Sequence, residues 1–104
     1  MLRVVLTTVP PDQAEALAEA LIEGRYAACV QILPEMRSTY SWQGEITRDA
    51  ERLLLIKVPT SHVEACMDAL GGMHPYEVPQ IIALTVDKVA TAYLAWAQAC
   101  VGED

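Results

Sequence analysis

The sequence predicts one α+β domain in which helices cover a β-sheet, and three observations carry this prediction. Short β-branched apolar segments alternate with segments whose apolar residues recur at helical spacing. Prolines and glycines stand between those segments, as expected for turns. The length of 104 residues is close to the commonest size of a single domain, so residues 1–104 are interpreted as one unit.

The first part of the chain is expected to form a strand, a helix and a second strand. Residues 2–8 are β-branched and apolar, and a pair of prolines ends them. Apolar residues then recur every three or four positions; Asp12 and Glu15 have the spacing of a capping box, and Gly24 is placed to end the helix. Residues 25–33 are again apolar and are closed by a proline, which predicts the second strand.

A long β-hairpin is predicted for residues 36–58. Gln43 and Gly44 separate two strand-like segments and have the form of a two-residue turn. Residues 52–58 continue the second segment as an apolar strand, and the polar residues 48–51 before it suggest a bend or a bulge. The hairpin is longer than one sheet needs, so we expect part of it to extend as an arm.

The remaining elements complete a known pattern. Ser61 and Glu64 form a second capping box, and the helix that they open is expected to end at residues 71–72. Residues 80–86 form a strand, and an apolar stripe over residues 89–100 predicts a C-terminal helix. The order is β-α-β-β-α-β plus a helix. With right-handed crossovers, this order gives a ferredoxin-like sandwich with a long hairpin arm and an additional C-terminal helix.

Composition limits the partners of the chain. Its hydrophobic content of 53% is high for so short a domain, which suggests that part of it is buried against other copies of the chain. A net charge of −7 argues against nucleic acid, whose phosphates require clustered Lys and Arg. No segment approaches the roughly 20 apolar residues of a membrane span, and no secretory signal is visible. The three cysteines are widely spaced and odd in number, which is typical of free thiols, and the cytoplasm is the expected compartment.

A proline-bounded corner at residues 74–79 is the first candidate site. Its prolines fix the backbone and hold His74 and Glu77 close together at low conformational cost. An imidazole with a carboxylate suits a divalent transition metal, copper above all. A His and a Glu that cap loop backbone would look the same, so the residues alone leave both interpretations open. Cys29 is either a small core residue or a further ligand.

Aromatic residues of the arm are the second candidate site. Tyr40 and Trp42 alternate to one face of the hairpin, where intersubunit packing is favoured over stacking on a ligand. Glu51, Arg52 and Lys57 form either a polar cluster or solvated strand edges. No Ser-His-Asp arrangement, phosphate-binding glycine loop or Cys-x-x-Cys motif is visible, so an enzyme is not expected.

Five sequence blocks occur together in a characteristic order. They are Leu21-x-x-Gly24-Arg25-Tyr26-Ala27-Ala28-Cys29-Val30, Arg37-Ser38-x-Tyr40-x-Trp42-x-Gly44-x-Ile46, Glu51-x-Leu53-Leu54-x-Ile56-Lys57, His74-Pro75-Tyr76-Glu77-Val78-Pro79-x-Ile81 and Tyr93-Leu94-x-Trp96. In this order and spacing they resemble the CutA family of divalent-cation tolerance proteins. The resemblance covers nearly the whole chain.

The resemblance implies a tight homotrimer linked to tolerance of copper and other divalent cations, in a family without an established enzymatic reaction. We expect a non-enzymatic protein whose metal ligands are His74, with Glu77 as a second ligand or orienting residue and Cys29 as a third. Some members carry a Cys in the first strand and a second His at the corner, where this chain has Thr7 and Met73, so two ligands of such a site are absent.

The trimers of this family are also similar to the PII signalling proteins, which bind effectors between subunits. The alternative hypothesis is therefore a binding module that holds a small molecule, such as an organic anion, or a partner segment. Its intersubunit cleft would be lined by Tyr40, Trp42, Lys57 and Tyr76, with Glu77 beside them.

Overall fold

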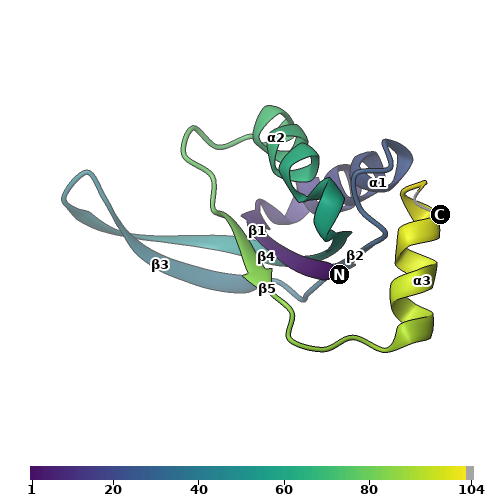
Figure 1. Cartoon of the computed structure of the whole chain (residues 1–104). Coiled ribbons are helices and arrows are strands. Elements are labelled where there is room, and N and C mark those ends of the chain that lie inside the picture. Colours follow the sequence, from purple (N-terminus) through teal and green to yellow (C-terminus); the bar gives the residue numbers. More distant parts are fainter. Residues whose placement is uncertain (103–104) are drawn as a thin grey trace.

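The structure, a computed structural model, describes residues 1–102. Its elements are β1 (Leu2–Val9), α1 (Ala14–Glu23), β2 (Cys29–Ile32), β3 (Met36–Trp42), β4 (Glu45–Pro59), α2 (Val63–Met73), β5 (Ile81–Thr85) and α3 (Thr91–Cys100). The sheet has the order β2-β4-β1-β5 with antiparallel neighbours, and β3 pairs with β4 outside that path. This is the predicted α+β sandwich (Figure 1).

The long strand β4 belongs to both the body and the arm. Its first half pairs with β3 from Met36 opposite Glu51 to Trp42 opposite Glu45, and its second half pairs with β1. The ladder runs through residues 48–51, so the predicted bend or bulge is wrong. At the tip Gln43 and Gly44 have φ of 51° and 82°, as in the tight turns that match strand twist, so the two-residue turn is confirmed.

The main core lies between the sheet and one layer of helices. Apolar residues at alternate positions of β1 and β4 pack against the inward faces of α1 and α2. The fully buried residues of this core include Val5 and Ile56 from the strands and Leu21 and Leu70 from the helices. Helix α3 stands at one end of the sheet (Figure 1), where Ala97 packs on Leu2 in a second, smaller cluster. Across residues 1–102, each helix falls short of the length and apolar character that a membrane span requires.

The face of the sheet that points away from α1 and α2 is also apolar. Side chains alternate along a strand, so the neighbours of the buried core residues point to this open face. Ile82 and Leu84 of β5 lie here and are 45% and 44% exposed. Val4 and Leu6 of β1 stand opposite them in the ladder. A contiguous apolar surface of this kind is typical of a protein interface.

Several helix and strand boundaries differ from those predicted. The second strand is limited to β2, because residues 25–28 are used to leave α1 and reach the sheet. Helix α2 continues through residues 71–72 to Met73. Each main helix begins after a 3₁₀ turn, at Pro11–Gln13 and Thr60–His62, so the N-cap residues are Gln13 and His62, which form no side-chain cap hydrogen bond, and the predicted Asp12 and Ser61 do not occupy these positions.

The end of α1 also differs from the expectation in its mechanism. Gly24 has a φ of −78°, an ordinary helical value, and it is Arg25 that adopts the left-handed region with a φ of 58°. A Cβ on Gly24 would overlap the ring of Tyr26. The glycine therefore leaves room for that ring.

Candidate ligand-binding cleft

The corner after α2 is anchored by His74. Pro75 disfavours helical backbone at the residue before it, and His74 accordingly is extended with ψ of 137°. The His74 ring is buried, with Nε2 3.0 Å from the carbonyl oxygen of Thr8 and 3.1 Å from Oγ1 of Thr7. The backbone N–H of Tyr76 donates to Nδ1 over 3.2 Å. Because Nδ1 accepts, Nε2 carries the proton and donates to Thr8.

This arrangement keeps the imidazole of His74 neutral. Burial lowers its pKa, and the hydrogen bond to the Thr8 carbonyl and the nearby charge of Glu51 oppose that shift only in part. Both ring nitrogens are occupied by contacts inside the chain. His74 thus ties the corner to the end of β1, and a metal could reach it only by replacing one of these hydrogen bonds.

Glu51 is the buried charge of the site. It lies on β4 where the arm enters the body, and its exposed fraction is 6%. The hydroxyl of Tyr76 donates to its Oε2 over 2.7 Å. Within residues 1–102, Oε1 has no hydrogen-bond donor and no basic side chain forms an ion pair with the carboxylate. Burial, followed by this hydrogen bond, raises the pKa of Tyr76.

A cleft of about 760 Å³ separates the corner from the arm. It is lined by Thr8 at the end of β1, by Tyr40, Trp42 and Glu51 of the arm, and by Tyr76 and Glu77 of the corner, among others. No Lys, Arg or His of the described residues contributes to the lining.

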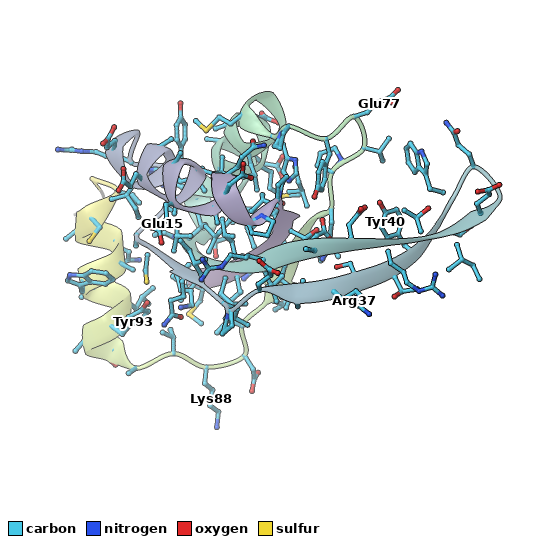
Figure 2. The ribbon with its side chains drawn as sticks, turned by 180° about the vertical axis from the view of Figure 1, so that it is seen from behind. Glu15, Arg37, Tyr40, Glu77, Lys88 and Tyr93 are labelled. Carbon is cyan, nitrogen blue, oxygen red and sulfur yellow. The ribbon has the colours of Figure 1, made fainter. Side chains whose placement is uncertain are left out.

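The arm and the corner form opposite walls of this cleft. In Figure 2, Tyr40 lies on the arm and Glu77 at the outer end of the corner, where its side chain points away from the arm. The Tyr40 hydroxyl donates to the carboxylate of Asp49, which raises the pKa of Tyr40. The ring of Tyr40 is thereby held against its own strand pair, facing the cleft.

The structure brings most of the predicted cleft residues together. Tyr40, Trp42, Tyr76 and Glu77 all line the same cleft. Lys57 does not: it lies on the open face of the sheet, where its Nζ donates to Oε1 of Gln31 on β2. Lys57 was the one cation in the predicted set, so the cleft of a single chain offers no positive charge for an anion.

The predicted metal ligands are not brought together in one chain. His74 packs on Thr7 at the helix-covered face, whereas Cys29 stands opposite Lys57 and points to the other face. Glu77 is exposed. Residues 1–102 contain no group of three His, Cys, Asp or Glu side chains placed to hold a metal ion. A three-ligand copper site therefore does not fit the residues of a single chain.

Glu51 is the functional candidate that sequence reasoning did not select. With Arg52 and Lys57 it was interpreted as a polar cluster or a solvated edge, but the structure separates the three. Nε of Arg52 donates to the carbonyl of Leu33 over 2.8 Å, and Lys57 contacts Gln31. The available signal was a carboxylate directly beside an apolar run, a position where burial is expected.

Comparison with known proteins agrees with this architecture. Residues 3–100 match the family described as CutA1 divalent ion tolerance protein. The divalent-cation tolerance protein CutA of Thermus thermophilus is 44% identical over 97 residues, which cover 92% of this chain and 94% of that protein.

Solved structures give the same result. A divalent cation tolerance protein of Thermus thermophilus has a TM-score of 0.91 at 43% identity, covering 98% of this chain and 100% of the other. A PII-like protein CutA from Nostoc sp. has a TM-score of 0.90 at 32% identity, covering 95% and 96%.

Proposed function

Since the chain belongs to the CutA1 family of divalent ion tolerance proteins, we propose that it is a non-enzymatic cytoplasmic homotrimer that binds divalent cations. The observation that carries the binding proposal is the cleft, which holds the buried carboxylate of Glu51 and no basic side chain among the described residues. A site with this charge attracts cations and repels anions.

The assembly proposal is supported by the apolar open face of the sheet. Ile82 and Leu84 are large, exposed and adjacent to the half-buried apolar residues of β1, so covering this face would remove a contiguous apolar area from water. The proposed number of three subunits comes from the family resemblance. The odd number of free cysteines suits a reducing compartment such as the cytoplasm.

The chemistry of the cleft bears on which cation it would hold. Its side-chain acceptors are oxygens of carboxylates, hydroxyls and an amide, which suit hard divalent cations. Copper binds most tightly to any given set of nitrogen or oxygen ligands, so Cu²⁺ is expected to compete at the same carboxylate. We therefore assign the metal contact to Glu51 and leave His74 as the residue that holds the corner in place.

Titration calorimetry with Cu²⁺ and with Mn²⁺ tests this assignment. The Glu51→Gln variant is expected to weaken binding by roughly tenfold or more, because an interaction with a charged group is lost. Gln retains an oxygen that can accept from Tyr76, so the fold is preserved. The matched control is Glu45→Gln at the tip of the arm, which changes the same charge outside the cleft lining.

The His74→Gln variant separates the two assignments. Its metal affinity is expected to stay within about twofold of the wild type at a temperature where both are folded. If His74→Gln abolishes binding and Glu51→Gln leaves it unchanged, the metal lies at the imidazole and the cleft assignment is wrong.

A second candidate function is favoured by the size and walls of the cleft. At about 760 Å³ it is within the range of small-molecule pockets and far larger than a metal ion. Tyr40, Trp42 and Tyr76 give it aromatic walls, which are typical of sites for organic ligands. We propose that the chain also acts as a PII-like binding module that holds a small molecule in this cleft.

A further inference from the structure

We propose that the small molecule held in the cleft is an organic cation, whose ammonium group sits against Glu51 between the aromatic rings of Tyr40, Trp42 and Tyr76. This inference rests on the proposed small-molecule function and names its ligand class. It replaces the organic anion that the sequence suggested with a ligand of opposite charge.

The first argument is the state of Glu51. Glu51 is more than nine-tenths buried and lines the cleft, yet within residues 1–102 it accepts a single side-chain hydrogen bond, from Tyr76 to Oε2, so Oε1 is left without a donor. A buried carboxylate without a cationic partner costs free energy. An ammonium group supplies both the missing charge and the missing donors, since it carries N–H bonds and no acceptor.

The second argument is the aromatic walls. Tyr40 and Trp42 are two residues apart on β3, so both point to the same side of the arm. The two residues are 40% and 43% exposed, so they are accessible to a ligand in the cleft that they line. The face of an aromatic ring attracts a cation within about 6 Å of its centroid, and Trp does so best.

The hydroxyl groups of the walls strengthen this argument. Tyr40 donates to Asp49 and Tyr76 donates to Glu51, so both phenols direct their protons to carboxylates. Neither hydroxyl is then turned to the cleft as a donor for an anion. Donation to a carboxylate also enriches the ring in electron density, which favours a cation over its face.

The third argument concerns the remainder of the ligand. The cleft also carries hydroxyls of Ser38 and Thr39 and the amide of Gln80. These groups lie along the lining without a full charge, so they can hydrogen-bond the polar part of a molecule whose ammonium end is held elsewhere. A bare metal ion would leave that part of the cleft to water. The geometry thus fits a molecule with one or two ammonium groups on a short chain.

A basic side chain of a second copy of the chain could satisfy Glu51 instead. Two observations favour the small molecule: the cleft volume is several times that of one Lys or Arg side chain, and the aromatic rings remain exposed around it. The experiment below distinguishes the two occupants.

The test is titration calorimetry of the assembled protein in buffer with a metal chelator, so that divalent cations play no part. The probes are putrescine and choline, compared with 1,4-butanediol as the neutral analogue of putrescine and succinate as the anion. Putrescine is expected to bind at least about tenfold more tightly than butanediol, and succinate is expected not to bind. Binding is expected to weaken as salt is raised, because the contact is ionic.

Three variants locate the contact. Glu51→Gln is expected to weaken putrescine at least about tenfold while leaving butanediol unchanged, and Trp42→Leu is expected to weaken choline by about two- to fivefold. Glu45→Gln, the control at the arm tip, is expected to leave both affinities unchanged.

Other outcomes overturn the inference in distinguishable ways. Succinate binding without putrescine binding leaves the small-molecule function intact and makes the ligand class wrong. Metal binding without any organic ligand overturns the small-molecule function as well. Putrescine binding seen only after the oligomer is dissociated shows that a side chain of another copy occupies Glu51.

Discussion

Through its two ring nitrogens, His74 contacts two other parts of the backbone. It holds the end of β1 through Thr8 and fixes the start of the corner through the N–H of Tyr76. The same corner carries the Tyr76 hydroxyl to Glu51, so the position of one cleft wall depends on an imidazole that itself faces the core. We infer that His74 stabilises the corner, whereas the proposed metal contact, Glu51, is held in place by β4.

The pH dependence of stability follows from the same residue. The pKa of His74 is lowered in the folded chain, so near pH 6.5, where an ordinary His titrates, the unfolded chain binds more protons. The contribution of the neutral His74 to the free energy of unfolding is therefore expected to be fully present above pH 6.5. It is expected to decrease as the pH falls from 6.5 toward the pKa of His74 in the folded chain. Chemical denaturation of wild type and His74→Gln at pH 7.5, 6.5 and 5.5 measures this.

The variant is expected to lose roughly 1–3 kcal/mol of stability at pH 7.5, from the buried hydrogen bonds, and to show a flatter pH dependence. An equal slope in both proteins would contradict the assignment of the neutral imidazole.

At the scale of single residues, the sequence predicted which residues lie close together better than it predicted what each residue does. It selected the corner because prolines restrict its backbone, and that restriction is what places His74. It could not show how Nε2 is used, because the partners of that nitrogen, Thr7 and Thr8, are more than 60 residues away. The alternative to a metal-ligand role for His74 was a side chain that hydrogen-bonds loop backbone, and this describes its contacts in this chain.

At the scale of secondary-structure elements, the turn of the arm was predicted most directly from the sequence. Gln43 and Gly44 predicted the turn, because few residue pairs adopt positive φ at low cost. Residues 48–51 misled the prediction, since their polarity reports exposure to solvent and says nothing of whether the ladder continues. A strand whose two faces are both solvated loses the alternation that would have identified it.

The turn supplies a prediction for the arm alone. Gly44 has a φ of 82° and no atom within 4 Å of a Cβ placed on it, so Gly44→Ala introduces backbone strain without a clash. The expected cost is about 1–2 kcal/mol. It should appear as roughly 5- to 30-fold faster hydrogen exchange of the arm amides, with the core amides of β1 unchanged.

Gln43→Gly is the matched change at the adjacent position, where φ is 51° and a non-glycine residue is already strained. It is expected to leave arm exchange equal or slower. Faster exchange in both variants would show that the turn conformation in solution differs from this one.

At the scale of the whole molecule, the strand order was predictable and the cleft was not. Right-handed crossovers leave few arrangements for two β-α-β units, so the order β2-β4-β1-β5 follows from the element order. The cleft depends on Tyr76 meeting Glu51 across 25 residues of chain, and on an arm that extends the molecule to 48 Å along its longest axis. Periodicity contains no information on such a distant pair.

The open face gives the prediction for assembly. Leu84→Asp places a charge on the apolar surface and is expected to reduce the proposed homotrimer to monomers at micromolar concentration, because an unpaired charge in an interface costs several kcal/mol. Light scattering coupled to size exclusion gives the mass, and circular dichroism checks that the monomer remains folded.

Ile22→Asp on α1 is the control, since Ile22 is equally apolar and 42% exposed but lies in the helix layer. It is expected to keep the oligomer. A trimeric Leu84→Asp protein would place the interface elsewhere.

The two tryptophans of the sequence are distributed so that each reports on a different end of the molecule. Trp42 stands in the cleft wall, and Trp96 stands on α3 with its ring 5.5 Å from that of Tyr93. Light absorbed at 295 nm excites only these two indoles. A Trp96→Tyr protein therefore has a single emitter placed at the candidate site, and its fluorescence lifetime and accessibility to quenchers record the filling of the cleft without any attached label.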